Sequence, residues 1–443
     1  MTPALLRQWR NARRLFAAPA PGPGEAARLR AAMSLLATPL LDGEAAGALQ
    51  RLLDTPGWAP PRLPESAHRP LRFLLASHAH TLGVPLEALF RDAPCPTPRE
   101  VRRHGILFLR RQKALGLALE ALQAGGIGRC FLVKGAAVAP YYAEPPARLM
   151  SDVDLVVPPT LCQEAARVLR GAGFIQGPRH TSEIFVHPTI AASIDLHTTS
   201  EELFAVLEGE CSPVASGGGW QGARLLPPAL QFLVLAAHAA KHAGATPWRD
   251  VADARALLAA MLPPGPGPHA LPAGLAHWAG RLGLVEELDA LLGLVRWAGG
   301  PLLPPCGPVT GRTRRLARLY RQLALEPVNP EVIRFAGKLG APPGELATAA
   351  WAALRRQLSP GAAPVGEALG DPQVAPPGDA RFRQRDFGLG LAMPPAASPR
   401  TQRLKVLVIA AMVSSPRARQ LLPLVRERAA LSQINPWPFR PAT

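Results

Sequence analysis

The stretch Phe131–Leu155, FLVKGAAVAPYYAEPPARLMSDVDL, constrains the fold of this chain more than any other. It opens with the apolar run Phe131–Val133, which predicts a buried strand, and its second apolar run carries Asp152 and Asp154 at alternate positions. Because side chains alternate between the two faces of a strand, both carboxylates point the same way. Two adjacent, partly buried negative charges are unfavourable unless a cation offsets them, and hard divalent cations prefer oxygen ligands. The stretch therefore predicts a metal site on a sheet.

A third carboxylate follows on a later predicted strand, Ser193–His197. Asp195 and His197 share one face of this strand, and Ile194 and Leu196 share the other. Three carboxylates on neighbouring strands suit a two-metal phosphoryl-transfer site, in which one carboxylate can also help to deprotonate the acceptor. The alternative is an ordinary solvated sheet edge. The preceding strand, KG turn and helix favour the metal site.

These motifs resemble a known family. LVKGAA, RLMSDVDLVV and IDLHTTS are similar to the motifs of nucleotidyltransferases of the DNA polymerase β superfamily, and more closely to an uncharacterised bacterial group with a KG…R…DxDL…DLH pattern. The helix LVLAAHAAKH is also similar to that group, and the resemblance covers about Arg99 to Leu258. It implies an enzyme that moves an NMP from an NTP to a hydroxyl or similar group of an unknown acceptor. The ligands that it implies are the metal ligands Asp152 and Asp154 and the third carboxylate Asp195, for two Mg²⁺ ions.

The resemblance also implies nucleotide contacts at the turn. Lys134 can supply positive charge, and Gly135 and Ala136 offer backbone N–H groups at a helix start. The superfamily usually has Ser or Gly where Ala136 stands, so the hydroxyl is missing here. Arg148 either binds a phosphate through its planar guanidinium or pairs with Asp152.

Two alternative functions are also open, and Ala136 motivates the first of them. One is a nucleotide-binding or partner-binding module with weak or no turnover. The other is a toxin–antitoxin or antibiotic-modifying nucleotidyltransferase, since both use related cores. The chain has no P-loop, GxGxxG, GxSxG or HExxH motif.

Three histidines are weaker candidates for the site. His197 can orient a carboxylate, contact the acceptor, or serve as a core histidine. His238 and His242 are four residues apart, so they share a helix face that can hold a metal. No third ligand can be assigned to them, which favours a role lining a cleft.

Composition limits the partners of this chain. The formal net charge is +17, which favours anionic ligands such as an NTP, but no Lys/Arg run with interleaved aromatic residues marks a dedicated DNA-binding motif. The expected partners are an NTP and an acceptor that is a small molecule, a protein or RNA. The five cysteines form no CxxC pair, and no apolar run is long enough to span a bilayer, so we expect a soluble, cytoplasmic protein.

Apolar periodicity and Pro/Gly breaks predict an α+β fold, a small mixed sheet of the polymerase β-like type embedded in a mostly helical protein. Expected helices include Glu100–Gln123, Ala137–Tyr142 and one near Leu275–Leu294. The expected parts are an N-terminal helical region (1–98), a nucleotidyltransferase core (99–215), a helical domain (216–358), a flexible Pro/Gly/Ala-rich linker (359–400) and C-terminal amphipathic helices (401–443).

Overall fold

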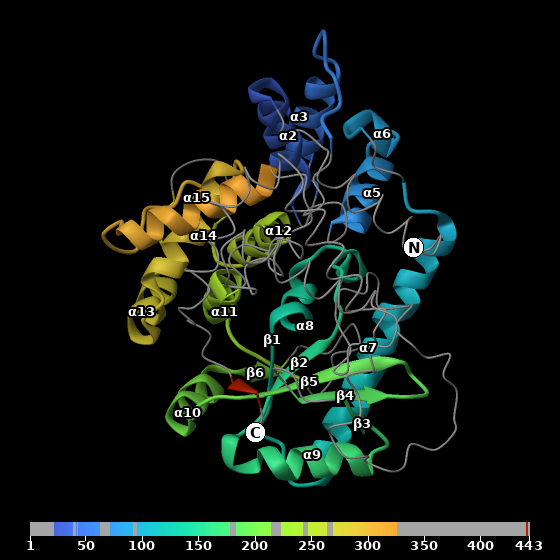
Figure 1. Cartoon of the computed structure of the whole chain (residues 1–443), viewed down its shortest axis with the longest axis vertical. Coiled ribbons are helices and arrows are strands. Elements are labelled where there is room, and N and C mark those ends of the chain that lie inside the picture. The colour runs from blue at the N-terminus through green and yellow to red at the C-terminus, as the bar shows by residue number, and fades with distance from the viewer. Residues whose placement is uncertain are drawn as a thin grey trace, which may run out of the picture. The chain divides into compact units, whose positions relative to one another are not determined.

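The computed structural model describes residues 22–38, 41, 43–62, 71–91, 95–177, 183–213, 223–241, 247–263, 269–325 and 440–441. They all belong to one compact unit of the chain, made of residues 20–330 and 430–443. The end of the expected helical domain (326–358), the linker 359–400 and all but two residues of the part 401–443 lie outside the described residues. The described unit combines a mixed sheet with many helices, which confirms the expected α+β class (Figure 1).

The sheet is built around β1 (Phe131–Val133), β2 (Val153–Val156) and β5 (Ala192–Thr198). Strand β1 pairs antiparallel with β2, and β2 pairs parallel with β5. The strand order is β3-β4-β5-β2-β1-β7-β6, with β8 also pairing with β5. The remaining strands are β3 (Ile175–Gln176), β4 (Glu183–His187), β6 (Ser212–Pro213), β7 (Arg224–Leu225) and β8 (Arg440–Pro441).

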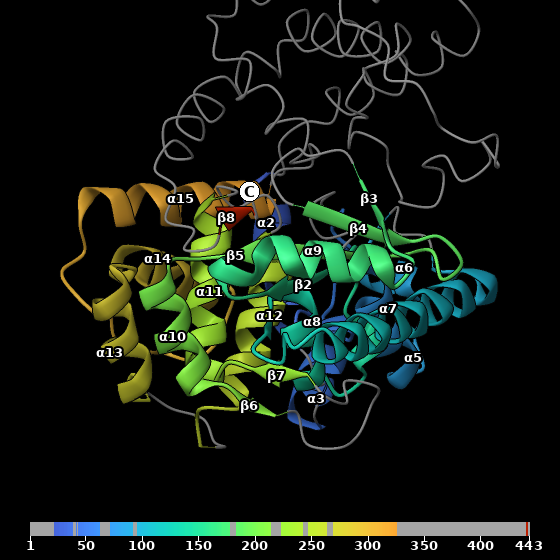
Figure 2. The same ribbon diagram turned by 90° about the horizontal axis from the view of Figure 1, so that it is seen from below.

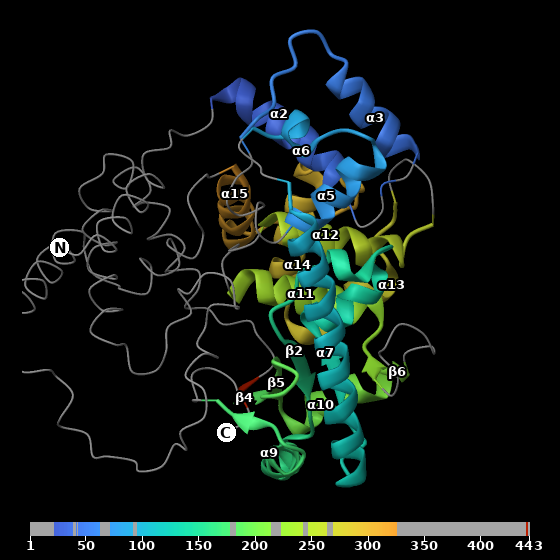
Figure 3. The same cartoon turned by 90° about the vertical axis from the view of Figure 1, so that its right-hand side faces the viewer.

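Helix α7 (Pro98–Ala124) carries much of the core beside the sheet. A capping box starts it: the Thr97 hydroxyl accepts from the Glu100 backbone N–H, and the Glu100 carboxylate accepts from that of Thr97. Its buried face includes Phe108, Leu115 and Leu122, and it packs against β5 and α9 (Cys162–Gly171). Figure 3 shows α7 running from beside α5 past β5.

Helix α8 (Lys134–Val138) connects β1 to β2 and begins three residues earlier than expected. A 3-10 turn, Ala139–Tyr141, replaces the rest of the expected helix, because Pro140 supplies no backbone N–H for a helical hydrogen bond. The strand-to-helix transition therefore falls at Lys134.

A group of helices packs beside α8 and β1 (Figure 1). The Gln231 side chain of α11 donates to the carbonyl of Leu132 at 3.1 Å, which joins this group to the sheet. The single helix expected near Leu275–Leu294 is wrong, because Gly283 has φ +66 and ends the first of two helices in the left-handed conformation. The helices are α11 (Pro228–Lys241), α12 (Pro247–Ala259), α13 (Ala273–Leu282), α14 (Val285–Trp297) and α15 (Gly311–Leu325).

The N-terminal helices attach to this group through Arg255 of α12. Its guanidinium donates to the carbonyls of Ser34 at 2.5 Å, Ala37 at 3.2 Å and Ala298 at 2.6 Å. These carbonyls end α2 and α14, where a positive charge is favourable. No helix in the described part of the chain combines the length and the apolar content needed to cross a membrane. The N-terminal helices are α2 (Pro23–Leu36), α3 (Gly43–Leu53), α5 (Arg72–Thr81) and α6 (Leu86–Leu89).

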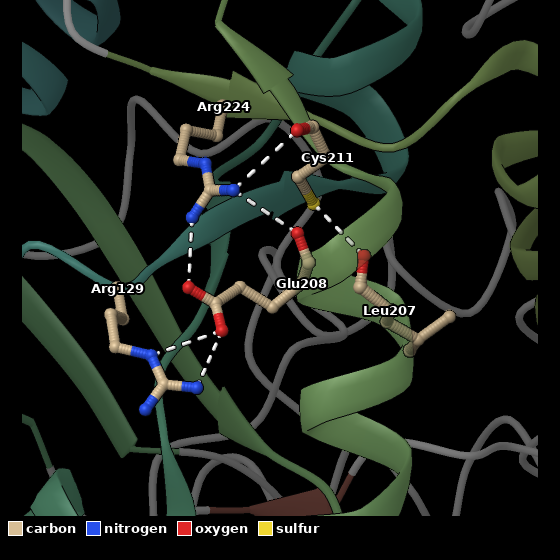
Figure 4. Close-up of polar contacts among 5 residues, drawn as sticks. All are labelled: Arg129, Leu207, Glu208, Cys211 and Arg224. Carbon is tan, nitrogen blue, oxygen red and sulfur yellow. Dashed lines mark hydrogen bonds and ion pairs between the residues drawn. The ribbon is translucent and has the colours of Figure 1, made fainter.

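Helix α10 (Glu201–Glu210) lies beside the last two strands at one end of the sheet, β7 and β6 (Figure 2). Its Glu208 carboxylate accepts hydrogen bonds from Arg129 and Arg224, and Arg224 also donates to the carbonyls of Glu208 and Cys211 (Figure 4). The end of α10 is thereby joined to β7 and to the residues before β1. β6 and β7 have only two residues each, and periodicity did not predict them.

Candidate functional site

The site is built where β2 and β5 lie side by side. Their parallel register pairs Asp154 with Asp195, and both side chains are buried. His197 lies two residues further along β5, with Nε2 2.9 Å from Asp154 Oδ1 and 3.5 Å from Asp195 Oδ2. Ligand atoms of these three residues all lie within 4.8 Å of one another. The structure thus brings together two of the three carboxylates predicted from sequence, with His197 between them.

Lys134 reaches the same cluster from the end of β1. Val133 is paired with Asp154 in the sheet, so the next residue starts beside that carboxylate. Lys134 has φ 57, in the left-handed region that residues with a Cβ seldom adopt except at turns and functional sites. Its ammonium donates to Asp154 Oδ1 and lies 3.3 Å from His197 Nε2. The turn therefore directs the lysine at the carboxylates.

The charges in this cluster depend on one another. Burial alone would raise the pKa of Asp154, but the Lys134 ammonium and His197 outweigh it and hold that pKa below its usual value. Burial alone would lower the pKa of His197, but hydrogen bonds to Asp154 and Asp195 raise it above the ordinary value. Asp154 is therefore ionised at neutral pH, and its charge is offset within the protein.

Asp152 lies one residue before β2 and next to this tight group. Its side chain is partly buried, and Oδ1 accepts a hydrogen bond from the Ser151 hydroxyl at 2.8 Å. Burial raises the pKa of Asp152 to about 6, with smaller contributions from the negative charges of Asp154 and Asp195. The charges of Asp154 and Asp195 thus raise the pKa of Asp152. Asp152 is not part of the group formed by Asp154, Asp195 and His197, whose ligand atoms all lie within 4.8 Å of one another.

Lys241, at the end of α11, adds a second lysine that sequence reasoning did not select. It is partly buried, and its pKa is lowered by burial and by the nearby positive charge of Lys134. The charges of Asp195 and Asp154 oppose this effect, so Lys241 lies within electrostatic reach of the carboxylates. Its position in the His-x-x-Lys-His segment was the available signal, but that segment was considered only for its histidines.

The turn residues Gly135 and Ala136 are fully buried or nearly so, and Arg148 packs beside them. The Arg148 guanidinium binds Asp253 of α12 through two hydrogen bonds, Nε–Oδ1 of 2.8 Å and Nη2–Oδ2 of 2.6 Å. Its carboxylate partner is therefore Asp253 of α12, whereas sequence reasoning had considered Asp152 as that partner. Asp253 is only 1% exposed.

The weaker histidine candidates are placed in part. His238 lies on α11 and is partly buried, and His242 lies outside the described residues. Across the described ranges, the group of at least three possible metal ligands that meets the 4.8 Å limit consists of Asp154, Asp195 and His197. The favoured role of His238 and His242 in lining a cleft, and the alternative of a metal held by them, stay predictions.

Comparison with known proteins supplies the family. Residues 102–266 match the family described as uncharacterised nucleotidyltransferase. This region belongs to that family. Searches of curated proteins and of solved structures found no match. The matched region contains every site residue described above, from Lys134 to Asp253. The buried site and the family assignment therefore concern the same part of the chain.

The residues of the nucleotidyltransferase region fit a divalent cation. Carboxylate oxygens are the ligands that Mg²⁺ prefers, and the parallel register brings two carboxylates together. Asp195 Oδ1 is buried and has no hydrogen-bond partner in the described part of the chain, which is unfavourable for a carboxylate oxygen unless a cation or donor approaches it. His197 would add an imidazole, which suits Zn²⁺ better than Mg²⁺.

Proposed function

We propose that the nucleotidyltransferase region transfers an NMP from an NTP to a hydroxyl or similar group of an acceptor, with Mg²⁺ as the metal. The observation that carries this proposal is the β2–β5 register, which sets Asp154 opposite Asp195 in a region of this family, with Lys134 beside them. The family supports nucleotidyl transfer and an NTP as donor. The identity of the metal, the kind of acceptor and the role of each residue are part of the proposal.

The carboxylates hold the metal and the reacting hydroxyl. Asp152 and Asp154 serve as metal ligands, and bound Mg²⁺ supplies Lewis-acid polarisation of the phosphoryl oxygens. Asp195 completes the site, and its unbonded Oδ1 is available to accept a proton from the acceptor hydroxyl. His197, whose raised pKa favours the imidazolium, orients the carboxylates of Asp154 and Asp195 by hydrogen bonding.

The two lysines bind the triphosphate. Lys134 already contacts an anionic oxygen at the site, and a phosphate offers its ammonium another anionic partner. Lys241 carries a partly buried ammonium whose pKa is lowered, and a polyphosphate would stabilise its charged form. This cationic pair takes the place of the hydroxyl that Ala136 cannot supply.

A second candidate is a nucleotide-binding module without turnover. Lys134 and His197 already offset the charge of Asp154 in the protein, so this carboxylate does not need a metal to stay ionised. Ala136, which is fully buried and lacks a hydroxyl, points the same way. The two candidates agree on NTP binding and differ in pyrophosphate release.

The deciding experiment incubates the full chain with each NTP labelled at the α-phosphate, in Mg²⁺ or Mn²⁺, with pools of tRNA, protein or aminoglycosides. We expect labelled acceptor and pyrophosphate with one pool, and loss of both in Asp152→Asn. The matched control is Glu208→Gln, because the Glu208 carboxylate pairs with Arg129 and Arg224 and not with the residues of the cluster. Calorimetry with each NTP and Mg²⁺ runs in parallel. Absence of NTP binding would refute both candidates, and binding without pyrophosphate release from any pool would favour the second.

A further inference from the structure

A buried polar network lies behind the turn that carries Lys134. Arg148, just before β2, forms two hydrogen bonds to Asp253 of α12, and their side chains are 7% and 1% exposed. The hydroxyl of Tyr142 donates to the same carboxylate at 2.7 Å. Residues more than a hundred positions apart therefore meet in the interior. Neither the metal ligands nor the proposed proton transfer uses them.

The network touches the backbone of the turn. A Cβ added to Gly135 would come within 2.6 Å of Arg148 Nη1 and 3.4 Å of Met150 Cγ. The guanidinium thus lies directly against the residue that follows Lys134, an approach that only glycine permits. On the other side of Lys134, Val133 is held by its pairing with β2. The backbone is therefore held immediately before and immediately after Lys134.

Arg148 is not available to a phosphate without losing this arrangement. Its Nε and Nη2 bind Asp253, and its Nη1 donates to the carbonyl of Leu149 at 3.4 Å. Burial alone would lower the pKa of Arg148, and Asp253 more than offsets this effect and raises it. Removing the Asp253 charge would leave a buried guanidinium without its counter-ion, so the guanidinium would move away from Gly135 towards water or another acceptor.

We propose that Arg148, Asp253 and Tyr142 are positioning residues that hold Gly135 in place and thereby direct the Lys134 ammonium at the carboxylate cluster and the NTP. The consequence for nucleotide binding rests on the proposed function. The consequence for Lys134 does not. Helix α12, outside the sheet, thus controls the geometry of the phosphate-binding turn.

The first measurement follows Lys134 without any ligand. The chain has only five lysines, so ¹³Cε-lysine labelling gives five signals, and Lys134→Met assigns the one that matters. We expect Asp253→Asn to shift this signal towards that of an exposed lysine. The matched control is Glu287→Gln, which breaks another buried ion pair, 2.5 Å from Arg312. It should lower the unfolding temperature but leave the Lys134 signal in place.

The second measurement is calorimetry of NTP with Mg²⁺, at a fixed interval below the unfolding temperature of each variant. We expect Asp253→Asn and Arg148→Lys to weaken NTP binding about tenfold or more, and Glu287→Gln to leave it unchanged. Arg148→Lys keeps the charge but loses the two hydrogen bonds to Asp253 and the guanidinium that lies against Gly135. Tyr142→Phe keeps the ion pair and loses one hydrogen bond, so we expect it to weaken NTP binding only a few-fold. This variant keeps the proposal testable if Asp253→Asn fails to fold.

The outcomes separate the two proposals. An unshifted Lys134 signal in folded Asp253→Asn or Arg148→Lys overturns the positioning role. Equal loss of NTP affinity in Glu287→Gln also overturns it, because a general loss of stability would then explain the effect. A wild-type chain that binds no NTP refutes the proposed function alone, and the Lys134 signal still decides whether the network positions that residue.

Discussion

The left-handed backbone at Lys134 predicts that replacing this residue by glycine destabilises the protein less than replacing it by alanine. Lys134→Gly and Lys134→Ala both remove the ammonium that binds Asp154, so this loss, roughly 3 kcal/mol for a broken buried pair, is common to both. The variants differ in the Cβ atom. At φ 57 a Cβ costs about 1–2 kcal/mol, and glycine avoids this strain.

The net difference follows from two opposing effects. Glycine loses more conformational entropy on folding, about 0.5–1 kcal/mol relative to alanine. Subtracting this from the relief of strain leaves Lys134→Gly more stable than Lys134→Ala by roughly 0.7 kcal/mol at the midpoints of the two ranges. At an ordinary helical position the order is reversed.

The assay is urea unfolding followed by circular dichroism, with the free energy of unfolding compared between the two variants. Lys113, exposed in the middle of α7, supplies the matched control. There Lys113→Ala should be more stable than Lys113→Gly by about 1 kcal/mol. If Lys134→Ala is at least as stable as Lys134→Gly while the Lys113 pair behaves as expected, the strained turn is refuted.

Three further predictions concern the turn, the metal and the core. Gly135→Ala should lower the free energy of unfolding by about 1–3 kcal/mol, because the new Cβ meets the Arg148 guanidinium. Gly105→Ala on α7 should stabilise the protein, because nothing lies within 4 Å of the added Cβ there. Equal changes in the two variants, measured by urea unfolding, would contradict the close contact at Gly135. Since the pKa of Asp152 is about 6, Mn²⁺ affinity measured by calorimetry should fall about tenfold per pH unit below 6, as a proton replaces the metal, and level off above it. The Asp152→Asn variant should lose this dependence, and an unchanged slope would rule out Asp152 as a ligand. Trp248→Phe should cost about 1–3 kcal/mol, because a buried 2.7 Å hydrogen bond to a carbonyl of α15 is lost; a thermal unfolding midpoint equal to that of wild type would disprove that estimate.

Local patterns were enough to predict the centre of the fold. The alternation of Asp152 and Asp154 with apolar residues, and of Asp195 with its neighbours, predicted two strands that carry acids. β2 carries Asp154 and β5 carries Asp195, whereas Asp152 lies one residue before β2. Apolar periodicity and the Pro/Gly breaks predicted the helix Glu100–Gln123, which lies within α7. Such signals extend over one strand or one helix, so the chain carries them without its tertiary contacts. Where a local signal was misread, as at Gly283, the error was a helix boundary.

The sequence by itself therefore determined the α+β class, the acids on β2 and β5 and the nucleotidyltransferase resemblance. Only the tertiary structure decided how the charges pair. Lys134 binds Asp154 because a left-handed backbone conformation at the end of β1 directs its side chain there. Glycine is the usual sequence signal for that conformation, and a lysine stands at this position instead. Arg148 binds Asp253 because α12 packs beside α8, and nothing local distinguishes Asp253 from the other acids of the chain. Which charges pair depends on packing between distant segments, and packing is a property of the folded chain.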